Sequence, residues 1–247
     1  MWSNLYGLHP RTNIYITVDV PKDPDKEKLE TLDQYTQALH RRFSGEEHRH
    51  VKIIVNSVNR HVNGSLRKVV FDLLDTNITK YIYVLQHDLI FMPDKIINHT
   101  AIVNAFDKYY EDEIVRIVGF SKDPNTQKIR KGGNTCQARE DLGLENPLKI
   151  YDGEGNKTDT AIYLTHSGYW TDQNHFTTVQ YYRDLITRIG PKPRFPEGPM
   201  MYAAGRDCRL HGTHWYGLPD DGKYICHLDA SHKYFNGICP KDFWEDD

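Results

Sequence analysis

The residues Gln86, His87 and Asp88 directly follow a short, almost entirely apolar run, Tyr81–Leu85. Runs of this kind form strands that are buried on both faces of a sheet. A carboxylate held at the end of such a strand could bind a divalent cation against a diphosphate, because Mg²⁺ and Mn²⁺ prefer carboxylate and phosphate oxygens. The alternative is that Asp88 only caps the element that follows. The sequence therefore indicates a candidate metal site at this strand end.

Two other segments combine acids with aromatic or turn residues. Asp19 ends the strand-like segment 13–20, where its carboxylate could accept hydrogen bonds from hydroxyl groups or only start a turn. The segment WTDQNHF places Trp170, Asp172 and His175 close together. Its indole ring could lie against the apolar face of a sugar, or be an ordinary core side chain. The last third of the chain is also rich in histidine outside any regular apolar period, which predicts a binding surface rather than a core.

The elements that position these residues alternate between strands and helices. Strands are expected at 13–20, from Val51, at 81–85 and at 114–120, and helices at 27–43, at 66–74 and at 95–110. This order is typical of a parallel sheet with crossover helices, in which ligands bind at the carboxyl ends of the strands. The pattern therefore predicts a ligand site near Asp19, Asn56 and the stretch 86–88. The polar, Gly-rich stretch 121–158 predicts long surface loops.

Taken in order, these motifs resemble those of the GT-A glycosyltransferases, particularly the family-2-like group. That family carries Asp-X-Asp or a variant after its third or fourth strand, where this chain has Gln86-His87-Asp88, and the upstream VNGSLRKVVFDLL resembles the helix start before that strand. The resemblance covers roughly residues 13 to 234. It departs in two places: the first acid is Gln, and only about a dozen residues precede Asn13, where the family has a further strand and helix.

The resemblance implies an α/β, GT-A-like (Rossmann-like) fold with a mostly parallel central sheet flanked by helices and a loop-rich C-terminal acceptor region. It implies one domain over residues 1–247. The nucleotide-sugar-binding half would span 1–120, and the acceptor and catalytic half would span 121–247.

The resemblance also implies an activity: metal-dependent transfer of a hexosyl or pentosyl group from a nucleotide-diphosphate sugar to a hydroxyl of a glycan or glycoprotein, with inversion. Glu197 would be the base that deprotonates the acceptor hydroxyl. The metal, Mn²⁺ or else Mg²⁺, would be held by Asp88 and His227, with Asp229 and His232 nearby. The implied donor-binding residues are Asp19, Asn56, Arg67, Gln86 and His87. The implied acceptor-binding residues are Trp170, Asp172 and His175.

Two other functions stay open at this point. A degenerate GT-A domain could bind nucleotide sugar or glycan without turnover, as a subunit of a larger enzyme, which would fit the short N-terminus and the Gln in the metal motif. A zinc hydrolase would use the 13 histidines and nearby acids, but the sequence has no HExxH motif or comparable close-spaced ligand pair.

Composition and length bear on the number of domains, on nucleic acid as a partner and on the location of the chain. A chain of 247 residues is typical of one α/β domain, and its 31 Lys and Arg against 34 Asp and Glu are dispersed, which does not favour nucleic acid as a partner. No apolar run is long enough to span a membrane, and the first residues lack the pattern of a signal peptide, so we expect a cytoplasmic protein. The sequence gives no oligomeric state.

Cysteines and asparagines bear on the compartment. The four cysteines form no CxxC pair, so we expect free thiols in a reducing compartment. Asn-X-Ser/Thr triplets, which would matter only in a secretory lumen, begin at Asn63, Asn77, Asn98 and Asn156.

Overall fold

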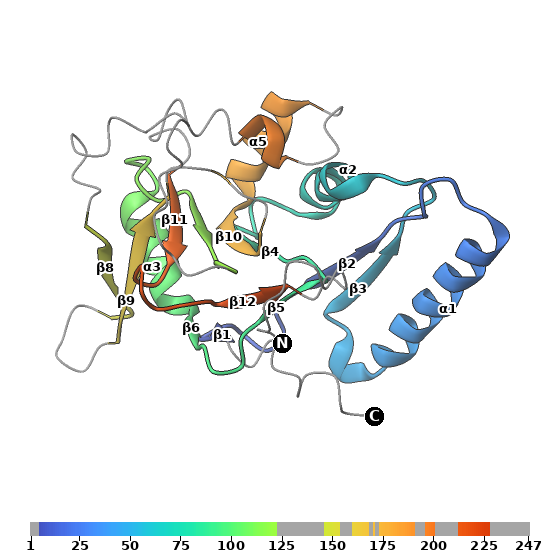
Figure 1. Ribbon diagram of the computed structural model, residues 1–247, viewed down its shortest axis with the longest axis horizontal. Coiled ribbons are helices and arrows are strands. Elements are labelled where there is room, and N and C mark those ends of the chain that lie inside the picture. The colour runs from blue at the N-terminus through green and yellow to red at the C-terminus, as the bar shows by residue number, and fades with distance from the viewer. Residues whose placement is uncertain are drawn as a thin grey trace. The chain divides into compact units, whose positions relative to one another are not determined.

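The computed structural model has both helices and strands and belongs to the α/β class (Figure 1). It describes residues 5–122, 146–153, 160–167, 170, 173–190, 196–200 and 212–227. The strands are β1 (Leu5–Tyr6), β2 (Ile14–Val18), β3 (Val51–Val55), β4 (Tyr81–Val84), β5 (Leu89–Phe91), β6 (Ile97–Asn98), β7 (Ile117–Gly119), β8 (Leu148–Tyr151), β9 (Ala161–His166), β10 (His175–Thr178), β11 (Thr213–Tyr216) and β12 (Ile225–His227). The helices are α1 (Lys26–Arg42), η2 (Glu46–His48), α2 (His61–Arg67), η3 (Lys68–Leu73), α3 (His99–Tyr109) and α5 (Val179–Ile189). None of the helices in these ranges is long and apolar enough to cross a membrane.

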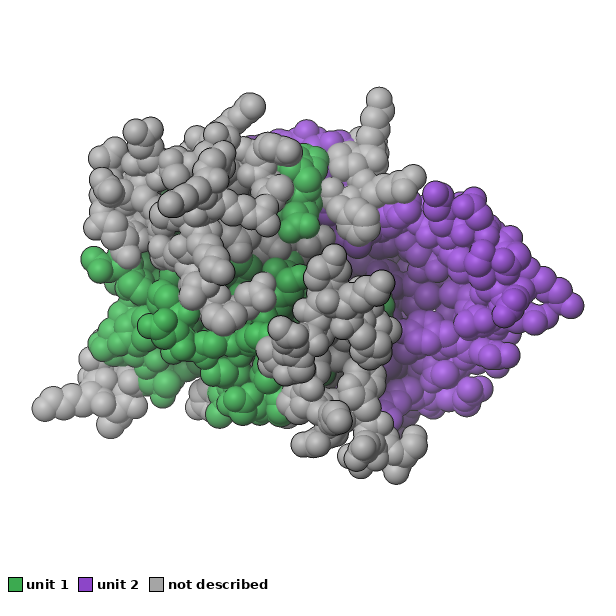
Figure 2. Space-filling model, in the orientation of Figure 1, with its two compact units in different colours: residues 1–7, 80–181, 197–247 green, residues 8–79, 182–196 purple. Residues whose placement is uncertain are grey.

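The chain divides into two compact units, which Figure 2 shows in separate colours. Unit 1 comprises residues 1–7, 80–181 and 197–247, and unit 2 comprises residues 8–79 and 182–196. We expected two halves that divide at residue 120, whereas that position lies inside unit 1. The assignment of the whole chain to one domain stays a prediction.

Unit 2 is built on a β–α–β segment. β2 and β3 pair in parallel, with Ile14 opposite Val51 at the start of both strands. α1 connects them and lies alongside them in Figure 1. It begins after Asp25, whose carboxylate accepts a hydrogen bond from the backbone N–H of Lys28 at 2.8 Å and so satisfies one of the unpaired donors of the first turn. The strand, helix and strand expected at the start of the chain are therefore confirmed.

The next helical segment of unit 2 is an α-helix that continues as a π-helix. α2 passes directly into η3 at Lys68. Arg183 of α5 holds the end of η3, since its guanidinium donates to the backbone carbonyl oxygens of Val70 at 3.0 Å and Leu74 at 3.1 Å. Carbonyl groups at a helix end have no partner in the helix itself, so these contacts stabilise the end. π-helical turns are rare in proteins, and those that occur are often found at functional sites, so this segment is a candidate for one.

The six-stranded sheet of unit 1 is mixed, with the strand order β4-β10-β7-β11-β9-β8. β7 and β11 pair in parallel, and the other four neighbouring pairs are antiparallel. The mostly parallel central sheet that we expected is therefore not confirmed. The physical reason is β10, which runs antiparallel between β4 and β7 and so separates two strands that point in the same direction. Its four residues, HFTT, are too few to show a strand period in the sequence.

An aromatic cluster fills the core of unit 1 beside β10. The ring centroid of Phe176 lies 4.7 Å from that of Tyr83 on β4 and 5.2 Å from that of Phe106 on α3. Rings at these separations stabilise a core beyond the effect of buried area. α3 begins after Asn98, whose side chain accepts a hydrogen bond from the backbone N–H of Ala101 at 3.0 Å. The helix expected at 95–110 is thus confirmed with a later start.

Three histidines of the last third are buried in unit 1 rather than gathered on a surface. His166, His175 and His214 expose 3%, 0% and 0% of their surface. His166 on β9 lies opposite His214 on β11, with 5.3 Å between the ring centroids. The binding surface expected from this concentration of histidine is wrong for these three residues, because β9, β10 and β11 are interior strands of the sheet.

β5 and β12 form a separate antiparallel pair in unit 1. Cys226 stands in the middle of β12, is 4% exposed and is disulfide-bonded. The other cysteine of that bond lies outside the described residues. The expectation of free thiols is therefore wrong for Cys226. Disulfides persist in oxidising compartments and are rare in the cytosol, so this bond bears on where the chain matures.

Candidate functional site

Asp19 and Asn56 follow the two parallel strands of unit 2 at their carboxyl ends and are hydrogen-bonded to each other. Nδ2 of Asn56 donates to Oδ1 of Asp19 at 2.7 Å, and Oγ of Ser65 donates to the same oxygen at 3.1 Å. The backbone N–H of Arg60 donates to Oδ2 at 2.9 Å. A carboxylate has about four acceptor positions. Asp19 therefore fixes the start of α2 against the strand end and keeps roughly one position for a ligand hydroxyl.

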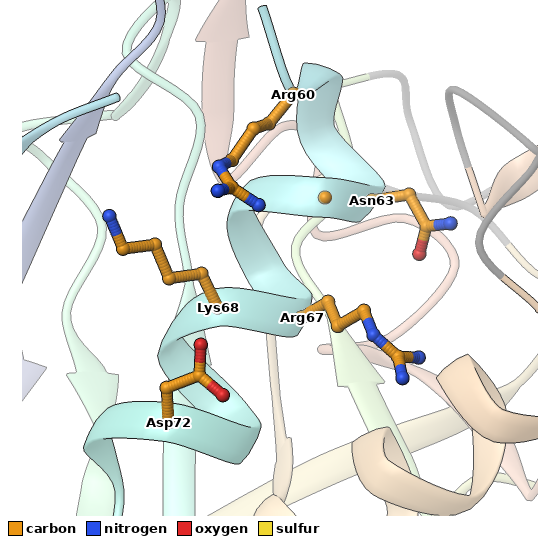
Figure 3. A pocket seen from close by; sticks show the side chains of 6 residues that line it. Arg60, Asn63, Arg67, Lys68 and Asp72 are labelled. Carbon is orange, nitrogen blue, oxygen red and sulfur yellow. The ribbon is translucent and has the colours of Figure 1, made fainter. Parts of the chain in front are cut away.

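A basic pocket of about 360 Å³ lies beside this network, within unit 2. Three cationic side chains and one acid are among the residues that line it: Arg60, Asn63, Gly64, Arg67, Lys68 and Asp72. In Figure 3 the side chains of Arg60 and Lys68 extend to one side of the helical segment, and that of Arg67 extends to the other. Nζ of Lys68 donates to Oδ1 of Asn56 at 3.1 Å, which connects the pocket to the strand ends. The excess of positive charge suits an anionic ligand such as a phosphate.

Arg67, which the sequence analysis assigned to donor binding, lines the basic pocket. Its guanidinium carbon lies 5.0 Å from the centroid of the Phe71 ring, on the exposed face of α2. Two other cations are tied to the strand ends: Arg60 donates its backbone N–H to Asp19, and Lys68 donates from Nζ to Asn56. A signal for them was present in the sequence, because Arg60, Gly64 and Lys68 recur at every fourth position and so share one helical face.

In unit 1, Gln86, His87 and Asp88 form the turn between β4 and β5, as the apolar run before them predicted. The backbone N–H of Leu89 donates to the carbonyl oxygen of Gln86 at 3.3 Å and closes the turn. His87 is exposed and Asp88 is half-buried. The carboxylate of Asp88 is thus attached to a tight turn at the end of a core strand.

A buried asparagine holds this turn in place. Asn174 immediately precedes β10 and is 0% exposed. Its Oδ1 accepts a hydrogen bond from the backbone N–H of Gln86 at 2.8 Å, and its Nδ2 donates to the carbonyl oxygen of Leu89 at 2.8 Å. One side chain therefore fixes both ends of the turn that carries Asp88. We did not select Asn174, and nothing in the WTDQNHF segment distinguished it from a surface asparagine.

The backbone register of β5 and β12 brings the position of His227 next to that of Asp88. His227 lies opposite Leu89, the residue that directly follows Asp88. Opposed residues of an antiparallel pair have Cα atoms about 4.5–5.5 Å apart. The two positions that the resemblance assigned to a metal, distant in sequence, are therefore neighbours in unit 1.

A carboxylate and an imidazole suit a divalent cation that is also bound by a diphosphate. Within the described ranges, no cluster of three or more His, Cys, Asp or Glu side chains is placed to hold a metal ion. Mg²⁺ is commonly held by one or two carboxylates together with phosphate oxygens, and imidazole suits Mn²⁺ better than Mg²⁺. The protein side of such a site thus needs few ligands. Asp229 and His232 lie outside the described residues.

Two of the three residues assigned to the acceptor are buried rather than displayed at a surface. Trp170 and His175 are both 0% exposed, with 6.0 Å between their ring centroids. Burial lowers the pKa of His175 to about 4, while its Nδ1–H donates to the carbonyl oxygen of Gln173. A sugar platform needs an accessible ring face, so these exposures favour the core alternative for Trp170. Asp172 lies outside the described residues.

Glu197, the predicted base, is half-buried and begins a short helical stretch, 197–200. The sequence suggested a turn bounded by proline and glycine at this place. Glu197 belongs to unit 1, as do Asp88 and His227. Residues 201–211, which follow this stretch, lie outside the described residues, and its role as a base stays a prediction.

Comparison with known proteins does not place the chain in a family. No protein-family model matches the sequence, and no curated protein matches it either. The resemblance to GT-A glycosyltransferases therefore depends on the sequence motifs and their order alone, and the function is argued from those residues and their surroundings.

Proposed function

We propose that the chain is a metal-dependent glycosyltransferase of GT-A type that moves a sugar from a nucleotide-diphosphate donor to a hydroxyl of a glycan or glycoprotein, with inversion. The observation that carries the proposal is the β5–β12 register, which sets His227 opposite the neighbour of Asp88. Further support comes from the hydrogen bond between Asp19 and Asn56 at the ends of two parallel strands.

The residues of unit 1 have distinct parts in this proposal. Asp88 and His227 hold Mn²⁺ or Mg²⁺, which when bound stabilises negative charge on the diphosphate as a Lewis acid. Asn174 keeps the turn rigid, so the carboxylate of Asp88 is oriented before the ligand arrives. Glu197 takes the proton of the acceptor hydroxyl as that oxygen attacks the anomeric carbon.

Unit 2 by itself carries residues that suit a nucleotide diphosphate. Arg60 and Lys68 supply charge-assisted hydrogen bonds to phosphate oxygens, and Asp19 accepts a hydrogen bond from a ribose hydroxyl. Arg67 keeps the donor role predicted for it, now as one of three cations lining the same pocket. The cytoplasmic location expected from the sequence is not part of this proposal, because the disulfide at Cys226 argues against it.

Calorimetric titration with a panel of nucleotide diphosphates, with and without Mn²⁺, tests the binding part. Asp88→Ala should abolish the Mn²⁺-dependent gain in affinity, whereas Asp94→Ala, which alters an exposed aspartate after β5, should leave it intact. A panel in which Mn²⁺ changes the affinity for no nucleotide diphosphate would contradict the proposal.

The basic pocket is tested in the same titrations without metal. A hydrogen bond to a charged group contributes about 1.5–3 kcal/mol, so Arg60→Gln should weaken nucleotide diphosphate binding by about tenfold or more. Arg42→Gln removes an exposed arginine from the last turn of α1 and should have no effect. Equal losses in both variants would show that only net charge matters and would remove the pocket from the proposal.

A second candidate function is a GT-A domain that binds nucleotide sugar or glycan without turnover. It is favoured by Gln86, which stands where the family has its first acid. This function would be established instead if the chain binds one nucleotide selectively but neither transfers the sugar nor slowly hydrolyses the donor.

A further inference from the structure

Three Asn-X-Ser/Thr triplets lie in the described ranges, and their asparagines differ sharply in accessibility. Asn63 and Asn98 expose 2% and 4% of their surface, whereas Asn77 is exposed. The fourth triplet, at Asn156, lies outside the described residues. The triplet is the acceptor pattern for N-linked glycans, which require a surface position in the folded protein.

The folded structure excludes a glycan on Asn63 and on Asn98. Nδ2 of Asn63 donates to the carbonyl oxygen of Gly190 at 3.2 Å, and Nδ2 of Asn98 donates to Oδ2 of Asp152 at 2.9 Å. A sugar attached to either nitrogen would replace a hydrogen of the amide and would need space around a side chain that is at most 4% exposed. A chain modified at either position could not adopt this fold.

Asn77 has the opposite surroundings. It stands in a tight turn after η3, where the backbone N–H of Thr79 donates to the carbonyl oxygen of Asp75 at 2.7 Å. Its own backbone N–H donates to Oδ1 of Asp75 at 2.9 Å, and its side chain makes no hydrogen bond with the residues that the structure describes. The neighbouring Ile78 is 83% exposed. The Asn77 amide is therefore presented on an open turn.

The disulfide at Cys226 supplies an independent indication of the compartment. A bond of this kind forms and persists in an oxidising environment such as the lumen of the endoplasmic reticulum. That lumen is where N-linked glycans are attached in eukaryotic cells. The exposed triplet and the disulfide lie in different units of the chain and point to the same environment.

We propose that Asn77 is an N-glycosylation site and that the chain matures in an oxidising secretory compartment. Nδ2 of Asn77 forms a bond to the anomeric carbon of an oligosaccharide carried on a lipid pyrophosphate. The bond from that carbon to the phosphate oxygen breaks, the lipid pyrophosphate leaves with the electron pair, and the amide loses one proton. This inference does not depend on the transferase activity.

Peptide mapping of the full chain purified from its own cells tests the proposal. Free thiols are alkylated at lysis, and the denatured protein is then treated with peptide N-glycosidase in heavy-oxygen water, which converts a glycosylated Asn into labelled Asp. We expect label at Asn77, none at Asn63 or Asn98, and no alkylation of Cys226. Either an unlabelled Asn77 or an alkylated Cys226 would overturn the proposal.

Variants secreted from a eukaryotic host give a second readout in the intact mass. Asn77→Gln should lower the mass by one glycan, and Thr79→Ser, which keeps the triplet, should not. Thr100→Ala removes the triplet of the buried Asn98 and should leave the glycan count unchanged. An unchanged mass for Asn77→Gln would overturn the assignment of this site.

Discussion

The clearest structural test of the site is removal of the side chain that holds the turn before β5. Asn174→Ala deletes both hydrogen bonds, the one from the backbone N–H of Gln86 and the one to the carbonyl oxygen of Leu89, each 2.8 Å long. Because Asn174 is 0% exposed, water does not replace its amide without local rearrangement. The turn that carries Asp88 would thereby lose its support from β10.

The size of the effect follows from the two backbone groups that lose these bonds. A buried polar group left without its partner costs about 1–3 kcal/mol. The bond to Leu89 is buried and the bond from Gln86 is part-buried, so their loss should destabilise the native state by about 2–4 kcal/mol. This is a large fraction of the roughly 5–15 kcal/mol that separates folded from unfolded domains. Asn104→Ala is the matched control. Within the described residues, half-buried Asn104 donates one hydrogen bond, to the carbonyl oxygen of Tyr151 at 3.0 Å, so its loss should cost about 1 kcal/mol.

Urea unfolding followed by tryptophan fluorescence measures both variants, with the free energy taken from the midpoint and the slope. We expect Asn174→Ala to lose at least twice the free energy of unfolding that Asn104→Ala loses, and to bind Mn²⁺ more weakly in the presence of nucleotide diphosphate. Equal losses in the two variants would refute the reasoning that Asn174 fixes the turn.

Three further predictions follow from single residues. Burial lowers the pKa of His175 to about 4, from the 6.5 of an unfolded chain, so the unfolded state takes up the proton first as the pH falls. The contribution of neutral His175 to the free energy of unfolding is therefore fully present above about pH 6.5. It falls by about 3 kcal/mol as the pH drops to about 4. In NMR its imidazole should not titrate near neutral pH, and a midpoint near 6.5 would contradict the burial. Lys80 donates to Asp107 and lowers the pKa of that carboxyl, but the two side chains are 66% and 51% exposed. Asp107→Asn should therefore lower the free energy of unfolding in urea by at most about 1 kcal/mol. A loss above about 2 kcal/mol would contradict screening of this pair by solvent. Gly212 has φ 44°, and a Cβ there would lie 2.8 Å from a backbone nitrogen. Gly212→Ala should therefore lower the free energy of unfolding by more than about 3 kcal/mol, whereas Gly222→Ala, where a Cβ would meet open space, should lower it by about 1–2 kcal/mol. Similar losses in the two variants would contradict the close contact at Gly212.

Local patterns predicted the elements of the first half of the chain well. The alternation of branched and aromatic residues in β2, the helical spacing in α1 and the apolar run of β4 are each contained in a few consecutive residues. Sheet direction is not local in this way. The antiparallel pairing of β10 with β4 sets His175 opposite Val84. The four residues of β10 contain no pattern that indicates the direction of this pairing.

The candidate site shows the same division between local and long-range information. The sequence predicts Asp88 as a site residue because a carboxylate directly follows an apolar strand. It does not predict Asn174, because the partners of Asn174 are backbone groups far away in sequence, and no residue type marks them. Arg67 was preferred to Lys68 on a motif, whereas the hydrogen bond of Lys68 to Asn56 is visible only in the fold.

The disulfide could not be derived from the sequence, because the spacing of four cysteines does not determine which of them pair. The bond of Cys226 is seen only in the folded chain, and it argues against the reducing compartment expected from the cysteine pattern. The exposures of Asn63 and Asn77 likewise follow from where the chain packs, because both stand in equally valid triplets.

Sugar release from a panel of nucleotide-diphosphate sugars, measured with Mn²⁺ and again with the metal chelated, tests the central claim most directly. The proposed transferase should turn over one donor selectively, lose that turnover on chelation, and lose it in Glu197→Gln while still binding the nucleotide diphosphate. Selective binding without release of sugar from any donor, or full turnover by Glu197→Gln, would contradict the account.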